Sequence, residues 1–373
     1  MKTSHELWIT NSEGARITDG YGRSLIVTAI RLFATKEDGA VGVMELILPA
    51  DFDASLLRPD NMVQVWRQPE GGSLELFNVY FVLALEYRLN GGELTLSAMG
   101  LDSNDLARRR FVAAYEGTAT SKRTDTADNL MKDFVNLTMV AEAWGPAAGD
   151  RDYANLTIEP DLDLGPILFV EGAWQNVLEM LTKLQDASRQ AGTEIFWRFD
   201  IASITSSSIS FVFRTQSGQP ATDLTPNGVM FSPQRGNLDD IIYREDHSQE
   251  VNYVFGLGQG QEVDQEVAEA GDSTRYGASV WAWSEGTVTA RSDSEPTAVQ
   301  DAADAALIAG RPKITFTAKI IDTPWMRFGI DWNWGCKIRV AFLDKTFDAI
   351  VKSVAIEVEA GNETVSASLE YRS

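Results

Sequence analysis

A run of alternating apolar and polar residues between glycine turns constrains the fold of this chain more than any other part of its sequence. From Phe77 to Tyr87 an apolar side chain recurs at every second position, so these side chains can share one face of a strand. Asn90-Gly91-Gly92 follows, and alternation resumes from Leu94 to Ala98. Paired glycines supply the positive φ that hairpin ends need. Residues 61–110 therefore predict an antiparallel meander, typical of a barrel or sandwich.

The charge balance limits the classes of function. The chain has 373 residues, with 54 Asp and Glu against 32 Lys and Arg, and a formal net charge of -22. A surface of this kind is not built to grip nucleic acid. Nucleic acid could still pass it without adhering, because like charges repel.

Cysteine and histidine are scarce. Cys336 is the single cysteine, which excludes an internal disulfide and a multi-cysteine metal site, and we expect it to be a small buried residue. The two histidines, His5 and His247, are expected at the surface or as caps rather than as ligands. The sequence has no apolar run long enough to span a membrane, and its start lacks a signal region, so we expect a soluble protein made in a cytoplasm.

Composition along the chain divides it into segments, and the length fits two or three domains. The order of predicted strands and helices along the chain indicates a β-rich α+β fold, with β-barrel or sandwich domains at both ends and a helical α+β domain between them. No fixed-period repeat is present. The predicted segments are an N-terminal β domain over 1–112, an α+β domain over 113–215, a linker rich in Gly, Pro, Ser and Asn over 216–238, and a C-terminal β domain over 239–373 with one helix at 295–309.

Motifs for catalysis or cofactor binding are weak. Asp161 and Asp163 beside Gly165 could bind Ca²⁺. The complete D-x-D-x-D-G spacing of a calcium loop and its distal Glu are missing, so an ordinary acidic loop is favoured. Paired carboxylates for glycoside hydrolysis cannot be identified from the sequence. We therefore expect no catalytic residue, no cofactor and no metal.

Two groups of residues are candidates for contacts with other chains. Arg108, Arg109 and Arg110 could form a basic patch, although in so acidic a chain they are expected to pair with carboxylates, within the fold or across subunits. Trp281 and Trp283 are predicted to share a strand face, where they could stack on sugars or anchor an interface. Core and subunit contact is the favoured interpretation of the late tryptophans Trp281, Trp283, Trp325, Trp332 and Trp334.

The second half of the chain carries a recognisable series of turns and aromatic residues. An alanine-rich helix ends in Gly310-Arg311-Pro312-Lys313, and Ile321-Asp322-Thr323-Pro324-Trp325 and Phe328-Gly329-Ile330-Asp331-Trp332-Asn333-Trp334-Gly335 follow. The chain resembles the Siphovirus Gp37-like family of tail hub (baseplate hub) proteins of long-tailed bacteriophages. Leu57-Arg58-Pro59-Asp60-Asn61 and the arginine run before Phe111 resemble it too. One departure is Cys336 after Gly335, where the family usually has Asp.

The resemblance implies a structural role in a virion. Tail hubs are homotrimers whose two tail-tube-like β domains per chain form a pseudo-sixfold ring. The ring joins the sixfold tail tube to a threefold tip, closes the tube and lets DNA pass on infection. The implied partners are a distal tail or tube protein above, tip, spike or fibre proteins below, and tape-measure protein or passing DNA in the lumen. The implied location is the tail tip, after assembly in the host bacterial cytoplasm.

Trp325, Gly329, Asp331 and Gly335 then become structural candidates alongside the arginine run and the tryptophan pair. The alternative function is a carbohydrate- or receptor-binding tail protein that uses the late tryptophans. A cell-wall hydrolase with paired carboxylates is the least favoured class.

Overall fold

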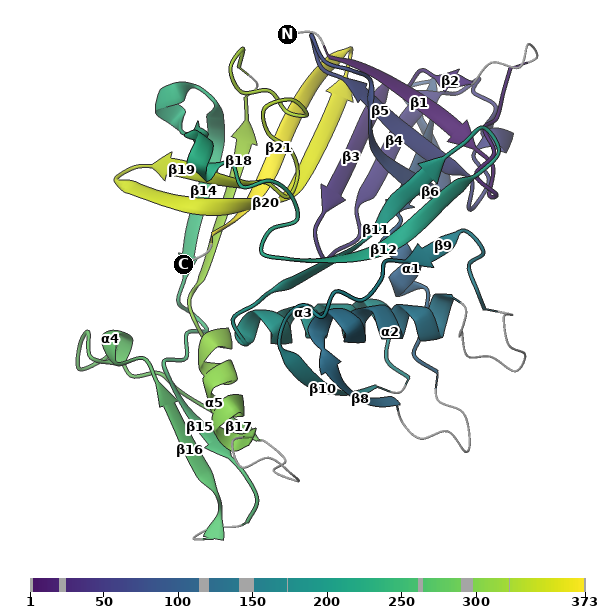
Figure 1. The fold of residues 1–373 in the computed structure, drawn as a ribbon. Coiled ribbons are helices and arrows are strands. Elements are labelled where there is room, and N and C mark those ends of the chain that lie inside the picture. Colours follow the sequence, from purple (N-terminus) through teal and green to yellow (C-terminus); the bar gives the residue numbers. More distant parts are fainter. Residues whose placement is uncertain are drawn as a thin grey trace.

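A computed structural model defines most of the chain. The described residues are 3–19, 25–113, 121–140, 151–172, 174–260, 264–289, 298–321 and 323–371. One large sheet runs through both ends of the chain, and smaller sheets and helices pack beside it (Figure 1). The β-rich α+β fold class predicted from the sequence is confirmed.

The N-terminal β unit, residues 3–102, forms one half of the large sheet. Its strands lie in the order β3-β4-β7-β6-β5-β1-β2, with antiparallel pairing throughout. The short helix η1 (Ala54–Leu56) precedes β5. The strands are β1 (Ser4–Thr10), β2 (Ile26–Val27), β3 (Arg31–Glu37), β4 (Val43–Pro49), β5 (Met62–Gln68), β6 (Glu75–Asn90) and β7 (Glu93–Asp102).

The C-terminal β unit, residues 218–246 and 313–371, forms the other half. Its order is β14-β18-β21-β20-β19, and β13 joins β19 in parallel. Two short helices, η2 (Thr225–Asn227) and η3 (Pro233–Arg235), flank β13. The strands are β13 (Met230–Phe231), β14 (Leu238–Asp246), β18 (Lys313–Ile320), β19 (Lys337–Phe342), β20 (Lys345–Glu359) and β21 (Asn362–Tyr371).

The two β units repeat one topology. The order β3-β4-β7-β6-β5 matches β14-β18-β21-β20-β19, and in each unit a long strand turns into a shorter one through a tight hairpin. Each hairpin has a β-bulge seven residues before the end of its first strand, at Leu83 before Asn90 and at Lys352 before Glu359. Matching bulges in matching hairpins indicate two versions of the same structural unit.

The turn before β5 also has a counterpart before β19. Asp60 has φ +65° and Gly335 has φ +76°. The amide of Asp60 donates to the carbonyl of Val82 (3.0 Å), as the amide of Gly335 donates to that of Val351 (2.9 Å). Val82 and Val351 each occupy the place before the bulge of their strand. The glycine that the sequence places at 335 therefore supplies a left-handed turn that an aspartate makes in the first unit.

The helical unit, residues 103–217, packs on the outer face of the N-terminal sheet (Figure 1). Met62, Val79 and Phe81 of β5 and β6 share its core, while Tyr80 and Val82 point into the core of the large sheet. Both faces of these strands are thus buried. The elements are α1 (Asp105–Arg108), β8 (Ser121–Thr126), α2 (Ala127–Met139), β9 (Leu156–Ile158), β10 (Ile167–Gly172), α3 (Val177–Gln190), β11 (Ile195–Ile204) and β12 (Ile209–Ser217).

A small unit, residues 247–312, is inserted between β14 and β18. Helix α5 packs on a sheet in which β15 pairs antiparallel with β16 and parallel with β17. Its core contains Val254, Ala270 and Ala303. The elements are β15 (Tyr253–Leu257), β16 (Val267–Gly271), α4 (Ser273–Tyr276), β17 (Glu285–Thr289) and α5 (Ala298–Ala309).

The structure corrects the faces predicted for β6. The alternation from Phe77 to Tyr87 does not place these side chains on one face, because bulges at Phe77 and Leu83 shift the register twice. Phe77 lies in the core of the large sheet, whereas Val79 lies in the core shared with the helical unit. A bulge adds one residue and exchanges the two faces of the strand.

One predicted segment also differs from the structure. The segment 216–238, predicted as a linker, contains β13, whose Phe231 is fully buried. Its Gly and Pro residues form the turns around that strand rather than a flexible connection. The helix predicted at 295–309 is α5, and its first three predicted residues, 295–297, lie outside the described residues.

A buried polar turn connects the N-terminal β unit to the helical unit. Ser103 Oγ donates to the carbonyl of Phe199 (2.6 Å), and Asn104 Nδ2 donates to the carbonyl of Ala40 (2.7 Å). Asp102 lies beside them and is 3% exposed. Burial raises the pKa of Asp102 to about 7, although Asn104 N–H donates to its carboxylate. The carboxyl group that the sequence places here is therefore part of the interior.

Gly335→Ala is expected to lower the free energy of unfolding more than Gly361→Ala. Both glycines have a positive φ, +76° and +78°, so each alanine adds about 1–2 kcal/mol of backbone strain. A Cβ at 335 would also lie 2.8 Å from Cβ of Pro220, whereas nothing lies within 4 Å of a Cβ at 361. Urea unfolding of the two variants measures the difference. Equal losses would contradict the close approach at 335.

Asp102→Asn is expected to remove a pH dependence of stability. The carboxyl pKa is 3.8 in an unfolded chain and about 7 in the fold, so between these values only the folded chain keeps the proton. The native protein therefore loses stability as the pH rises from about 4 to 7, by on the order of a few kcal/mol from this group. As the pH rises through this range, the free energy of unfolding of the variant should increase relative to that of the native protein. A pH-independent difference would refute the assignment.

Candidate assembly interface

The joint between the two β units is a backbone ladder. The second half of β20 pairs antiparallel with β3, from Ser353 opposite Glu37 to Glu359 opposite Arg31. Val354 and Ile356, on the core face of this half of β20, are fully buried. Since alternate pairs along the ladder exchange backbone hydrogen bonds, the two units are fixed edge to edge.

A buried ion network spans the same joint. Arg67 of β5 donates from Nε and Nη2 to both carboxylate oxygens of Glu363 of β21 (2.8 and 2.7 Å), and from Nη1 to the carbonyl of Phe328 (2.6 Å). His5 of β1 lies 2.6 Å from the same carboxylate. Burial alone would raise the pKa of Glu363, but the hydrogen bonds with His5 and Arg67 outweigh it and lower the pKa to about 2. We call His5, Arg67 and Glu363 the clamp.

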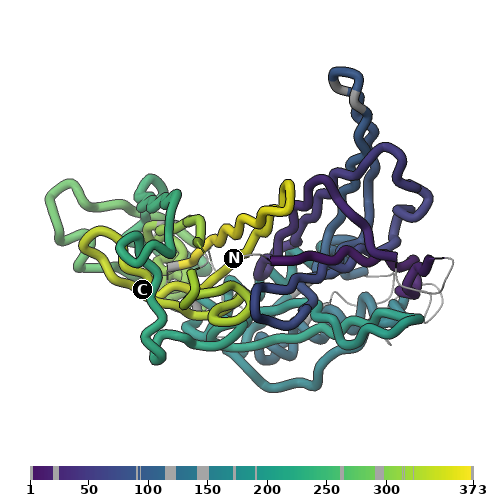
Figure 2. Tube along the Cα trace, turned by 90° about the horizontal axis from the view of Figure 1, so that it is seen from above, coloured from purple at the N-terminus to yellow at the C-terminus, as the bar shows by residue number. Residues whose placement is uncertain are grey.

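One hairpin is paired at the joint, and its counterpart is not. The β20–β21 hairpin lies against the N-terminal unit, whereas the matching β6–β7 hairpin projects away from the body (Figure 2). Among the described strands, β5 pairs with β6 only as far as Phe81, so residues 84–90 pair with β7 alone. Leu85, Tyr87 and Leu89 are 37, 56 and 71% exposed. An open strand edge with apolar side chains is a template for pairing with another strand.

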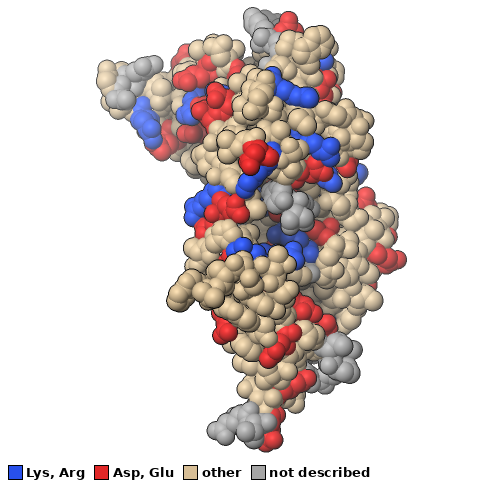
Figure 3. Space-filling model, turned by 90° about the vertical axis from the view of Figure 1, so that its left-hand side faces the viewer, with Lys and Arg blue, Asp and Glu red and all other residues tan. Residues whose placement is uncertain are grey.

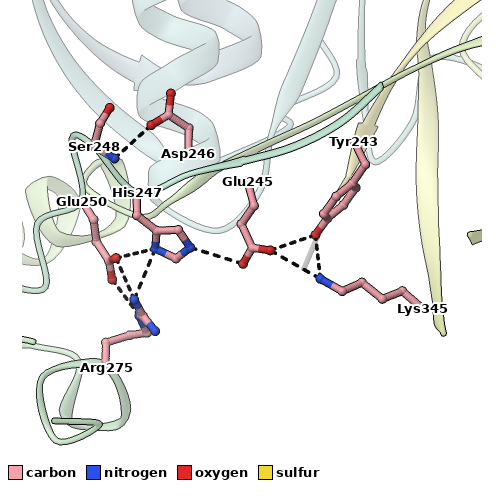
Figure 4. A network of polar contacts seen from close by, with 8 residues as sticks. All are labelled: Tyr243, Glu245, Asp246, His247, Ser248, Glu250, Arg275 and Lys345. Carbon is pink, nitrogen blue, oxygen red and sulfur yellow. Dashed lines mark hydrogen bonds and ion pairs between the residues drawn. The ribbon is translucent and has the colours of Figure 1, made fainter. Parts of the chain in front are cut away.

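A second open edge belongs to β14. Among the described strands β14 pairs with β18 alone, and Ile242 on it is 64% exposed. Ionic contacts brace its end (Figure 4). Glu245 contacts both Lys345 Nζ (3.4 Å) and His247 Nε2 (3.3 Å), and Lys345 also donates to the hydroxyl of Tyr243 (3.0 Å). These contacts hold the strand in place while its outer backbone edge stays open.

The same network continues into the small unit. His247 Nδ1 lies 2.6 Å from Glu250, which accepts two hydrogen bonds from Arg275 of α4 (2.7 Å each). Hydrogen bonding from Arg275, aided by His247, lowers the pKa of Glu250 to about 2. The hydrogen bond with Glu250 raises the pKa of His247. The small unit is thus connected to the open edge through charged side chains.

Charge is unevenly distributed on the face around β14. Figure 3 shows acidic and basic side chains intermixed over its upper part, and mainly acidic ones on the tapering lower lobe. This lobe corresponds to the small unit. The acidic residues described there are Glu250, Asp264, Glu266, Glu269, Asp272, Glu285, Asp301 and Asp304.

The predicted arginine run is bound within the fold. Arg108 Nε and Arg109 Nε each lie 2.6 Å from the fully buried carboxylate of Asp105, and Arg109 also reaches Asp60 (2.9 Å). Arg110 donates to the carbonyl of Arg151 and lies over the ring of Tyr153 at 4.2 Å. The three side chains therefore hold α1 and the adjoining loops together, and they do not form a separate basic patch.

The late tryptophans are divided between core and surface. Trp332 and Trp334 are buried in the large core. Trp281 is 89% exposed at a turn, and Trp283 stacks on Tyr276 with ring centroids 4.4 Å apart, so the strand face predicted for this pair does not exist. Trp325 is 86% exposed in a different turn.

Gly329 and Asp331 shape the turn beside the clamp. The carboxylate of Asp331 accepts from the backbone N–H of Arg327 (2.8 Å) and from its Nε (3.1 Å). Gly329 has φ +81°, and a Cβ there would lie 3.1 Å from Nη1 of Arg67. Together they position the carbonyl of Phe328 that Arg67 binds. Cys336, which follows Gly335, is 4% exposed, and its expected burial is confirmed.

Asp161 and Asp163 lie on a loop that packs against α2. Asp163 Oδ1 accepts from Asn129 Nδ2 (2.8 Å), and Asp161 is exposed. Partial desolvation, opposed by Lys132, raises the pKa of Asp161. Within the described part of the chain, no group of three or more His, Cys, Asp or Glu side chains could hold a metal ion. A helix long and apolar enough to cross a membrane is likewise not found in that part.

The clamp is the group of functional residues that the sequence does not reveal. Arg67 and Glu363 are separated by 296 positions, and His5, expected at the surface or as a cap, is a partner in the network. The one local signal is the charge of Arg67 at the end of a strand that is otherwise mostly buried. That signal shows that a partner is needed, but not which one.

Removing one member of the clamp is expected to destabilise the joint strongly. Glu363→Gln leaves Arg67 buried without its carboxylate, at a cost of about 3–5 kcal/mol, whereas Arg67→Met with Glu363→Leu should recover part of the loss. The contribution of Glu363 is present above pH 4.5 and is lost as the pH falls toward 2, because its pKa is lowered in the fold. Denaturant unfolding of each variant at several pH values measures both effects.

Arg31→Ala is the matched control for the clamp. Arg31 and Glu357 also join β3 to β20, but their side chains are 35 and 39% exposed. An exposed pair contributes about 0–1 kcal/mol. A loss as large as that of Glu363→Gln would show that the clamp has no special role.

Solved phage tail proteins share the fold. The tail protein from Neisseria meningitidis MC58 is 13% identical, with a TM-score of 0.58 over 98% of this chain and 96% of its own. The 43 kDa tail protein of prophage MuSo2 from Shewanella oneidensis is 14% identical, with a TM-score of 0.57 and 98% of both chains covered. Prophage tail protein gp18 from Listeria monocytogenes EGD-e is 11% identical, with a TM-score of 0.52 over 98% of this chain and 94% of its own.

Sequence comparison gives the family directly. No curated protein matches the chain. A family model described as Siphovirus ReqiPepy6 Gp37-like protein matches residues 19–369, which is nearly the whole chain. The chain therefore belongs to the Siphovirus ReqiPepy6 Gp37-like family of phage tail proteins.

Proposed function

We propose that the protein is a tail hub, a non-enzymatic ring of three copies at the tail tip. In this ring six β units continue the sixfold tail tube and connect it to a threefold tip. The observation that carries the proposal is the repeated topology: β3-β4-β7-β6-β5 and β14-β18-β21-β20-β19 occur in one chain and are joined edge to edge through β20 and β3. Three such chains supply six similar units.

The differences between the two β units support the change of symmetry. The N-terminal unit carries the helical unit on its outer face, and the C-terminal unit carries the acidic small unit. A ring of three chains would therefore repeat the β units six times and each attached unit three times. Attached units of this kind could bind threefold tip, spike or fibre proteins, while the β units meet the distal tail or tube protein.

The charge of the chain suits a passage for DNA. With a net charge of -22, a ring of three copies repels a polyanion, so tape-measure protein or DNA could occupy the lumen without sequence-specific binding. The hub would close the tube before infection and open it afterwards, a mechanical action that needs no catalytic group. Assembly in the host bacterial cytoplasm follows from this role.

The purified protein is expected to form a trimer, with a mass three times the 41.1 kDa of the chain, by light scattering during size-exclusion chromatography. Cryo-electron microscopy of the tail should place three copies around the tube axis. Trp281→Ala is the control, because this exposed tryptophan lies in the small unit and not on the β units. It should leave the trimer intact.

A monomeric mass in solution together with the absence of three copies around the tube axis would contradict the hub. If that monomer bound cell-surface glycans and Trp281→Ala abolished the binding, the alternative function of a carbohydrate- or receptor-binding tail protein would replace it. Six copies around the axis would also overturn the proposal, because the two β units of one chain would then not represent two positions of the ring.

A further inference from the structure

We propose that residues 84–90 of β6 pair antiparallel with β14 of a second copy of this chain, in the register that β20 and β3 use within one chain. This inference rests on the proposed ring and assigns the strands that close it. The contact that serves as its template is present in the structure, where residues 353–359 of β20 pair with β3. The two open edges are the counterparts of these two strands.

The first counterpart follows from the hairpins. Aligning the bulges at Leu83 and Lys352 places Leu85 at the position of Val354 and Tyr87 at that of Ile356. Leu85 is opposite Ala98 as Val354 is opposite Ala367, so both point to the same face of their sheets. Residues 84–90 are therefore the equivalent of the segment of β20 that forms the joint.

Exposure shows what this segment of β6 lacks. Val354 and Ile356 are each 0% exposed, whereas Leu85 is 37% and Tyr87 is 56% exposed. The side chains are apolar in both units. Their exposure differs because β20 pairs with a neighbouring unit, whereas this segment of β6 does not. An apolar strand edge left open is an aggregation hazard unless a specific partner covers it.

The second counterpart follows from the neighbouring strands. Met44 of β4 and Phe316 of β18 occupy equivalent places, because Met44 is opposite Gly100 and Phe316 is opposite Leu369 in the matching hairpins. Ala34 of β3 is opposite Met44, and Tyr243 of β14 is opposite Phe316. Residues 242–246 of β14 are thus the equivalent of residues 33–37 of β3.

The joint within the chain then predicts the register between chains. The pair Ile356–Ala34 within one chain corresponds to Tyr87 opposite Tyr243 of the second copy. The pair Ala355–Thr35 likewise corresponds to Glu86 opposite Arg244 of the second copy. Glu86 and Arg244 carry opposite charges, and their side chains are 57 and 69% exposed. Opposite charges directly across a strand pair are favourable. The register thus places two tyrosines opposite each other and one acid opposite a base, while Leu85 and Arg88 lie opposite Glu245 and Ile242.

In the described part of the large sheet, each chain offers the β6–β7 hairpin and the outer edge of β14 for this contact. A contact between unlike surfaces is head-to-tail, and it closes into a ring when the rotation between copies allows it. Because the link between chains copies the link within the chain, both would relate neighbouring β units in the same way. All open edges identified on β6 and β14 are used in such a ring.

Paired cysteines test the register. The full chain is prepared in a Cys336→Ala background with Tyr87→Cys and Tyr243→Cys, and separately with Glu86→Cys and Arg244→Cys. Adjacent pairs in an antiparallel ladder alternate between wide and close Cα spacing, so at least one pair suits a disulfide. Mild oxidation should give a covalent trimer on a non-reducing denaturing gel. Tyr87→Cys with Arg244→Cys, which places the thiols on opposite faces, should not.

Each other outcome has one meaning. A protein that is a trimer by light scattering, yet cross-links at neither matched pair, overturns the proposed strand pairing and leaves the hub intact. A protein that stays monomeric and does not cross-link overturns the hub itself. Long covalent polymers at a matched pair would support the strand contact but refute a closed ring.

Exchanging the charges provides a second measurement. Glu86→Arg and Arg244→Glu should each weaken the link between chains by about twofold to fivefold in its dissociation constant, and the double variant should restore it. Weakening in both single variants without restoration in the double variant would count against direct contact of the two side chains.

Discussion

The ladder between β3 and β20 is the contact on which the rest of the structure depends. It connects two β units that could otherwise move independently about the segments between them. The clamp of His5, Arg67 and Glu363 lies on the same joint and supplies charge-assisted hydrogen bonds between side chains that are at most 10% exposed. Backbone pairing sets the direction of the two sheets, and the clamp favours one arrangement of the units over others. A rigid joint of this kind would suit the proposed role in a ring that continues the tail tube.

Outside the joint, the two β units differ in how they bury their outer faces. The helical unit covers β5 and β6, so Met62, Val79 and Phe81 are buried on a face that an isolated sheet would expose. The polar turn at Asp102, Ser103 and Asn104 fixes that contact through hydrogen bonds to the backbone of the helical unit and the loop beside it. In the proposed ring, repeated units with different attachments would allow one chain to contact both sixfold and threefold neighbours.

Much of the local structure could be predicted from the sequence. The hairpin at Gly91-Gly92 and the end of α5 before Gly310 depend on residues close together in the chain, and the structure has both. The predicted faces of β6 were wrong because the bulges at Phe77 and Leu83 are set by the opposite strand. The strand expected at Trp281 was wrong because alternating aromatics alone do not supply a neighbouring strand. Of the candidate interface, Gly329, Asp331 and Gly335 lie at turns, but their relation to Arg67 was not predictable.

By itself the sequence determined the periodicities, the turns and the low content of histidine and cysteine, because these depend on single residues and their neighbours. Only the tertiary structure decided that the two ends are versions of one unit, since equivalent positions such as Met44 and Phe316 share a need for apolar bulk rather than a residue type. It also decided which distant charges meet. Arg67 contacts Glu363, 296 positions away, because the two sheets are joined at their edges. No local sequence pattern predicts which edges pair.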